Sequence, residues 1–346
     1  MDTTILLFLL QDGVTSGAIY ALLGLGLVLV FAVTRVILIP QGEFVTYGAL
    51  TYATLSAGKL PGTAYLVVLM GLVALVFDLI AARHRLNPRV ALRALAVNVL
   101  PPVVIYGLAT LAARSGAGVA VNVVLSLVIV APIGAYLYRI AYQPIAHASV
   151  LVLLIASVGV HLAMQGLGLL FFGAEGLRAP PISRAATSLA TLRITGQSLA
   201  VYTIALVLIA GLWLFFGYTI YGKALRATAV NRLGARLVGI RTTLSGQIAF
   251  LLAATIGAVS GILIVPITTI YYDSGFLIGL KGFVAAIIGG LASYPATALA
   301  AIVVGIVEAF SSFYASNYKE VIVFTLIIPV LLVRSLAHPA LDDEAE

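Results

Sequence analysis

The chain has 346 residues, of which 62% are apolar and only 9% are charged. A soluble domain carries about 25% charged residues, so this composition excludes a soluble enzyme, and the absence of cysteine excludes a secreted disulfide scaffold. The net charge of +7 is typical of a membrane protein with basic cytoplasmic loops, so we expect membrane lipid around the chain and no nucleic-acid partner.

Apolar stretches recur along the chain, and a helix needs about 20 such residues to cross a bilayer. The clear candidates are residues 14–33, 62–82, 95–113, 119–138, 150–172, 198–218 and 244–270. The weaker candidates are residues 42–57, 283–294, 297–313 and 321–333. The expected fold class is therefore all-α, a polytopic transmembrane helical bundle of about ten segments.

One weaker stretch, residues 283–294, is too short to span and ends before Pro295. A segment that does not span is tolerated at membrane depth only where protein or a cavity surrounds it. We therefore predict a half-helix or a re-entrant segment there.

The connections between these stretches indicate one domain. Long polar connections occur at 173–197 and 222–241, so we expect a single transmembrane domain over residues 1–340. The chain ends in an acidic run, and we expect residues 341–346 to form a disordered tail.

Two basic loops predict the orientation. Residues 83–93 carry four arginines, and residues 222–241 carry one lysine and four arginines. Four clear helices separate the two loops, so both lie on one side, which the positive-inside rule assigns to the cytoplasm. Counting backwards then puts the N-terminus outside.

No catalytic constellation is visible. Residues 217–224 match the phosphate-binding pattern Gly-x-x-x-x-Gly-Lys, but Ala224 stands where Ser or Thr would hold Mg²⁺, and a lipid-embedded helix precedes the motif where a strand is needed. The four histidines have no metal-ligand spacing. We expect no enzyme activity, no cofactor and no metal, and any ATP must be bound by a separate subunit.

Polar residues inside apolar stretches are the better functional signal, because burying them is costly without a partner or a cavity. Glu43 follows Pro40 at a helix start, where the macrodipole favours a carboxylate. We weigh two roles for Glu43 equally, as a helix cap and as part of a solute path. Glu308 lies in mid-segment, which favours function. His161 and Gln165 share one helix face, and a packing pair is favoured over a substrate contact. The residues that we assign to a solute path, as hypotheses, are Tyr20, Gln41, Glu43, Gln165 and Glu308.

The basic segment 222–241 predicts a short amphipathic helix that ends at Gly239. Its leucines recur at helical spacing. Such a helix is suited to docking into a groove of another protein and, equally, to resting on anionic lipid. The residues that we assign to a partner contact are Arg226, Arg232, Leu233, Arg236, Leu237 and Gly239.

Small residues four positions apart let helix backbones approach closely in a membrane. Three such pairs are present, and we favour packing inside the bundle over a dimer seam. The pairs are Gly13/Gly17, Gly257/Gly261 and Gly275/Gly279.

Several short motifs follow one another in a specific order. They are Ser16–Gly26, Gly42–Phe44, Tyr142–Ile145, Leu154–Gly159 with Gln165, residues 222–240, Gly289–Leu291 and Gly305–Glu308. In this order they resemble the branched-chain amino-acid permease family of ABC importers, and they cover most of the chain. Two departures stand out. The family has Asn-Phe-Ala-His before Gly-Glu where this chain has residues 38–41, which leaves the substrate open, and residues 71–118 are longer than the family norm, which suggests extra helical segments.

The resemblance implies a bacterial inner-membrane permease that forms the translocation path of an importer for a small solute, such as branched-chain or other apolar amino acids. It implies ATPase subunits that carry out the hydrolysis and push on 222–241, a second permease subunit, and a periplasmic substrate-binding protein. Urea, amides and aromatic acids remain alternative solutes. The alternative mechanism is an ion-coupled secondary transporter, with Glu308 at the coupling site.

Overall fold

The computed structural model describes residues 3–81, 87–183, 186–189, 192–291 and 293–337. The predicted acidic tail at 341–346, and Arg83 and Arg85 of the first basic loop, lie outside the described residues.

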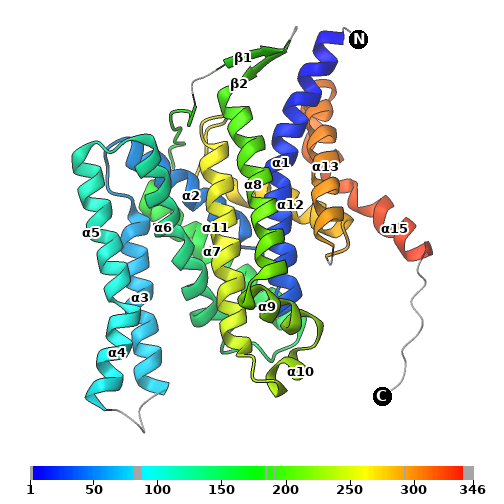
Figure 1. The fold of residues 1–346 in the computed structure, drawn as a ribbon. Coiled ribbons are helices and arrows are strands. Elements are labelled where there is room, and N and C mark those ends of the chain that lie inside the picture. The colour runs from blue at the N-terminus through cyan, green and yellow to red at the C-terminus, as the bar shows by residue number, and fades with distance from the viewer. Residues whose placement is uncertain (1–2, 82–86, 184–185, 190–191, 292, 338–346) are drawn as a thin grey trace.

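The described residues are helical almost throughout (Figure 1). The first half contains α1 (Thr3–Thr34), α2 (Gln41–Ser56), α3 (Gly62–Ala81), α4 (Pro88–Asn98), α5 (Leu100–Ser115), α6 (Val119–Leu137), the π-helical turn η1 (Tyr138–Tyr142) and α7 (Val150–Phe172). The second half contains α8 (Gly196–Tyr218), α9 (Ile220–Val230), α10 (Arg232–Leu237), α11 (Thr242–Ile264), α12 (Ser274–Ile288), α13 (Tyr294–Tyr314), the 3₁₀ turn η2 (Ser316–Tyr318), α14 (Lys319–Thr325) and α15 (Ile327–Ala337). A short antiparallel hairpin, β1 (Ala186–Leu189) and β2 (Leu192–Thr195), precedes α8.

The predicted all-α membrane bundle is confirmed. Within the described residues, nine helical stretches are long and apolar enough to cross a membrane, and α12 is a shorter apolar helix. The half-helix lies earlier than predicted, because Lys281 interrupts the apolar run inside α12 and the helix ends where Gly290 turns to a φ of 83°. Similarly, α11 ends at Ile264, two residues before Pro266, and does not continue to residue 270.

The core of the bundle is built around α1, α2, α11 and α12. Helix α1 packs against α11, α12 and α13, while α2 packs against α11 and α12. The large side chains of Phe44 and Tyr47 on α2 and of Phe250 on α11 are fully buried. Helices α3 to α6 lie on one flank and α13 to α15 on the other (Figure 1). Exposed apolar side chains cover these outer helices, as expected for surfaces that face lipid.

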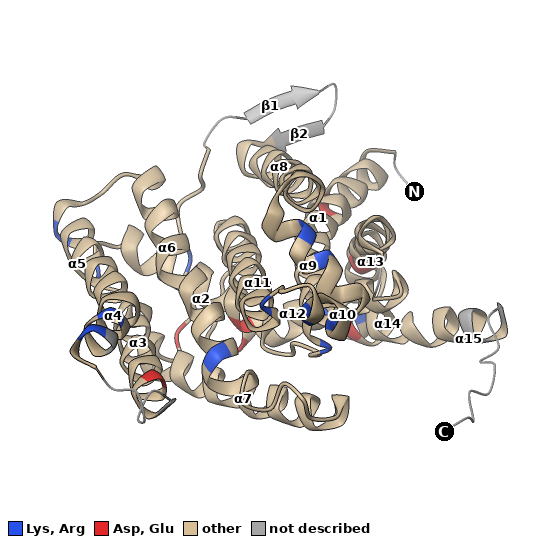
Figure 2. Ribbon diagram, turned by 60° about the horizontal axis from the view of Figure 1, so that its bottom comes forward, with Lys and Arg blue, Asp and Glu red and all other residues tan. Residues whose placement is uncertain are grey.

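The two basic segments share one end of the bundle. Figure 1 shows the start of α4 at the same end as α9 and α10, with the N-terminus and the β1–β2 hairpin at the opposite end. Figure 2 shows the basic residues of α9 and α10 gathered there. This arrangement agrees with the expectation that both basic loops lie on one side of the membrane.

The outer helix α3 is fixed to α6 through a polar clamp. The Asp78 carboxylate forms an ion pair with Arg139, which lies just beyond α6. Asn98, at the end of α4, donates to Asp78 over 2.7 Å and accepts from Arg139 over 2.7 Å. One carboxylate therefore joins three helical elements.

The glycine pairs lie at contacts inside this chain. Gly13 and Gly17 pack against the backbone of α13, and Gly257 and Gly261 pack against α2. Gly275 and Gly279 on α12 pack against the backbone at Gly42 on α2. This agrees with the expected internal packing, and it brings α12 against α2 at backbone distance.

Gly42→Ala is expected to destabilise the fold strongly. An added methyl group would overlap the carbonyl oxygen of Gly275, and because the obstacle is backbone, no rotamer change relieves it; overpacking costs about 1–3 kcal/mol or more. The matched control is Gly159→Ala in α7, where nothing lies within 4 Å of the new carbon and where alanine favours a helix by about 0.5–1 kcal/mol. Thermal unfolding in detergent should give shifts of opposite sign; equal midpoints would contradict the close α2–α12 contact.

Candidate functional site

The first polar cluster lies at the start of α2. The linker after α1 turns at Arg35, whose φ is 61°, and Pro40 caps α2 so that Glu43 falls in its first turn. The Glu43 side chain is fully buried, and its Oε1 lies 3.0 Å from Nδ1 of His161 on α7. The ring of Phe276 on α12 stacks on His161, with 4.7 Å between ring centroids. Three helices thus meet at one buried carboxylate.

Two of the predicted path residues, Gln41 and Glu43, lie together in this cluster, and Gln165 lies one turn along α7 from His161, half-buried. The Gln41 amide donates to the carbonyl of Ala253 over 3.1 Å. The partner of His161 in the structure is Glu43, whereas the sequence analysis favoured a pair with Gln165. Glu43 was identified from its position after Pro40, but its pairing depends on how α7 crosses α2, which periodicity does not encode.

Several buried acceptors in this cluster have no hydrogen-bond partner. They are Oε1 of Gln41, Oε2 of Glu43 and Oγ1 of Thr46, whereas Oε1 of Glu43 faces Nδ1 of His161. Buried polar atoms are normally hydrogen-bonded, and an unpaired one is costly. Chemically, the start of α2 is equipped to accept hydrogen bonds from a polar solute or from water.

A small apolar cavity of about 270 Å³ adjoins the cluster. Its lining includes Phe276, which stacks on His161, and Gly279, which packs on Gly42. Leu38, Leu154 and Phe283 contribute aliphatic and aromatic surface. The polar acceptors and the apolar hollow therefore adjoin the same residues of α12, Phe276 and Gly279.

The second polar cluster brings Tyr20 and Glu308 together, as two of the predicted path residues. The Tyr20 hydroxyl donates to Glu308 over 2.5 Å. The ammonium group of Lys281 on α12 lies 2.5 Å from Glu308 and 3.1 Å from Glu320 on α14, with only 7% of its side chain exposed. Sequence reasoning missed Lys281 and Glu320, although a lysine between apolar runs is itself a signal of a buried charge.

Helix α12 connects the two clusters, since Phe276 and Lys281 lie five positions apart on it. In the described ranges, no group of three or more His, Asp or Glu side chains is placed to hold a metal ion. The arrangement is that of two polar sites on either side of a half-helix buried in protein, which suits holding and passing a solute.

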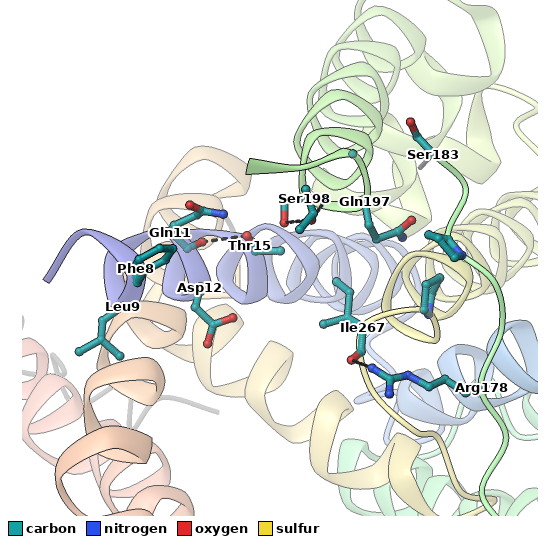
Figure 3. Close-up of a pocket in the computed structure, with 14 residues that line it drawn as sticks. Phe8, Leu9, Gln11, Asp12, Thr15, Arg178, Ser183, Gln197, Ser198 and Ile267 are labelled. Carbon is teal, nitrogen blue, oxygen red and sulfur yellow. Dashed lines mark hydrogen bonds between the residues drawn. The ribbon is translucent and has the colours of Figure 1, made fainter. Parts of the chain in front are cut away.

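An outer cavity of about 870 Å³ opens at the end of the bundle that carries the hairpin (Figure 3). It lies between α1, the segment before β1, the start of α8 and the turn after α11. Asp12 and Arg178 are the charged residues among the described residues that line it.

The opposite end presents α9 and α10, which are separate helices because Asn231 ends one and caps the other. Leu225 is fully buried against α1 and α11, whereas Leu233 and Leu237 are 69% and 81% exposed. Gly239, with a φ of 85°, ends the segment, as the sequence analysis predicted.

The three arginines of this end differ in their contacts. Arg232 donates to the carbonyl of Ala146 over 3.1 Å, and Arg236 donates to Thr242 over 3.0 Å. Arg226 is exposed on α9. The structure therefore uses Arg232 and Arg236 to fix α10, and it leaves the two leucines outward as an apolar surface.

Comparison with known proteins gives one consistent result. Residues 94–331 match the family described as "Branched-chain amino acid transport system / permease component". The chain is 26% identical over 345 residues to the high-affinity branched-chain amino acid transport system permease protein LivH of Escherichia coli (strain K12), covering 96% of each. It has the same identity and coverage with LivH of Salmonella typhimurium. With BraD of Pseudomonas aeruginosa it is 28% identical over 216 residues, covering 60% of this chain and 70% of that protein.

Proposed function

This chain belongs to the family of permease components of branched-chain amino acid transport systems, and we propose that it forms the solute path of an ATP-driven importer for branched-chain or other apolar amino acids. It is a multi-pass membrane protein. In our proposal it lies in a bacterial inner membrane, with α9 and α10 in the cytoplasm and the hairpin outside.

The observation that carries the proposal is the exposed apolar surface of Leu233 and Leu237 on α10. A helix that only supports its own bundle would bury its leucines, as the neighbouring Leu225 is buried. Exposed leucines at a basic end suit docking into a groove of another protein. The proposed occupant is an ATPase subunit. Because the sequence has no usable nucleotide site of its own, ATP must act through such a partner.

The proposed path runs along α12, with Tyr20 and Glu308 on one side and Gln41, Glu43 and Gln165 on the other. Its support is that both polar clusters contact this half-helix, which ends inside the bundle at Gly289. Irregular backbone at membrane depth occurs where it lines a cavity or is packed in protein. The further proposed partners are a second permease subunit and a periplasmic binding protein at the hairpin end.

The function is tested in proteoliposomes that contain this chain with its ATPase, second permease and binding protein. Uptake of L-leucine should require ATP on the side where Lys223→Cys, at an exposed position of α9 in a chain without other cysteines, reacts with an impermeant thiol reagent. An ionophore that dissipates ion gradients should leave uptake unchanged. Uptake that persists without ATP and stops with the ionophore would instead establish the ion-coupled alternative.

A further inference from the structure

The outer cavity carries one acid and one base beside apolar surface (Figure 3). We propose that it is a binding subsite for a zwitterionic amino acid with an apolar side chain, where Asp12 receives the ammonium group and Arg178 receives the carboxylate. This rests on the proposed function, because an importer would take up its solute at the hairpin end. A volume of about 870 Å³ lies within the range of ligand pockets, roughly 300–1,000 Å³.

Arg178 is held in place at the edge of the cavity. Its Nη2 donates to the carbonyl of Ile267 over 2.6 Å. The preceding residue, Leu177, exchanges two backbone hydrogen bonds with Ile270, of 2.9 and 3.0 Å. A guanidinium group has five N–H donors, and the bond to Ile267 uses one of them. The others can meet a carboxylate in a charge-assisted hydrogen bond.

Asp12 faces the same cavity from α1. Figure 3 shows its carboxylate directed into the opening, away from Gln11 on the same helix. The position of this turn is fixed on both sides, because Gly13 packs against the backbone of α13 and Thr15 bonds to Tyr202 on α8 over 2.7 Å. A carboxylate on a fixed turn is preorganised to receive an ammonium group.

The remaining lining suits an aliphatic side chain and the polar edges of an amino acid. Phe8, Leu9, Pro181, Pro266 and Ile267 supply apolar surface, and hydroxyl and amide groups of the α8 start lie among them. Opposite charges in equal number favour a neutral zwitterion over a purely anionic or cationic solute, which would leave one charged group of the cavity unpaired.

The experiment measures binding of L-leucine to the full chain in lipid nanodiscs by saturation-transfer NMR, with two analogues. One, 4-methylpentanoate, lacks the ammonium group, and the other, 3-methylbutylamine, lacks the carboxylate. L-leucine should bind at least about tenfold more tightly than either, since a hydrogen bond to a charged group contributes on the order of a tenfold change in affinity.

Two variants test which residue of the cavity binds which charged group of L-leucine. Asp12→Asn should weaken L-leucine binding about tenfold and leave 4-methylpentanoate unchanged, whereas Arg178→Gln should weaken L-leucine and leave 3-methylbutylamine unchanged. The matched controls are Glu175→Gln and Arg114→Gln, which remove exposed charges outside the cavity and should leave all three affinities within about twofold.

The subsite is overturned if either analogue binds as tightly as L-leucine, if L-leucine does not bind, or if the Asp12 and Arg178 variants behave like the controls. This failure is distinct from failure of the proposed function, which is decided by ATP-driven uptake in proteoliposomes. A complex that takes up L-leucine equally well with Asp12→Asn keeps the function and loses the subsite.

Discussion

Changing both Leu233 and Leu237 to glutamate is expected to abolish copurification of the ATPase with this chain, or to uncouple ATP hydrolysis from uptake. The two side chains are 69% and 81% exposed, so the substitutions should leave the bundle folded. Buried in a partner's groove, each leucine contributes about 1.5–3 kcal/mol, and a carboxylate in its place must be desolvated at a further cost. Pull-down from detergent extracts, followed by coupled uptake assays, measures both effects.

The control for this experiment comes from the basic residues of the same end. Lys223→Gln with Arg226→Gln removes two exposed charges and should have a much smaller effect. Arg232 and Arg236 are unsuitable controls, because their bonds to Ala146 and Thr242 hold α10 in place. If the charge variant were damaging and the leucine variant harmless, the helix would rest on anionic lipid.

Replacing Lys281 with methionine is expected to destabilise the chain by about 3–5 kcal/mol, the usual result of removing one partner of a buried ion pair. The reason is that Lys281 is 7% exposed and holds Glu308 and Glu320, which would then repel each other near the membrane interior. Chemical denaturation in mixed micelles gives the free energy of unfolding, and the same preparation gives uptake.

The double variant Lys281→Met with Glu308→Gln tests whether the loss of stability comes from the unpaired charge or from the changed shape of the side chain. It should be more stable than the sum of the two single changes predicts, by about 1 kcal/mol or more, because residues in one network are coupled. Lys223→Met, an exposed lysine, is the matched control and should change stability by less than about 0.5 kcal/mol. A Lys281→Met chain as stable as this control would show that the pair contributes nothing.

The fold could be predicted from apolar stretches because lipid leaves the backbone few alternatives to helices. The limits of α8 and α13 came within a few residues of the prediction, since polar residues flank them. The limits of α12 were not predicted, because Lys281 interrupts the apolar run of this helix. The carboxylates that pair with Lys281 lie on α13 and α14. Hydropathy scores each residue separately. A lysine that is neutralised by distant acidic residues therefore lowers the hydropathy of its segment and suggests a loop.

The sequence predicted which residues belong to the candidate site better than it predicted which of them contact each other. Polarity inside apolar stretches identified Tyr20 and Glu308 separately, and the structure joins them over 2.5 Å. The contact between Glu43 and His161 depends on the crossing of α2 and α7, which no periodicity describes. The outer cavity was missed, because its charged residues Asp12 and Arg178 come from segments far apart in the sequence that the fold brings to one cavity.

The clamp around Asp78 also places a condition on how the chain is made. Asp78 and Arg139 are 61 positions apart, and at about 5–20 residues per second a ribosome needs roughly 3–12 s to synthesise that interval. During this time α3 carries an acidic side chain whose cation has not yet been translated. The α3–α4 pair can therefore reach its final place only after the end of α6 has been synthesised, so this flank of the bundle is completed after its first two helices have been made.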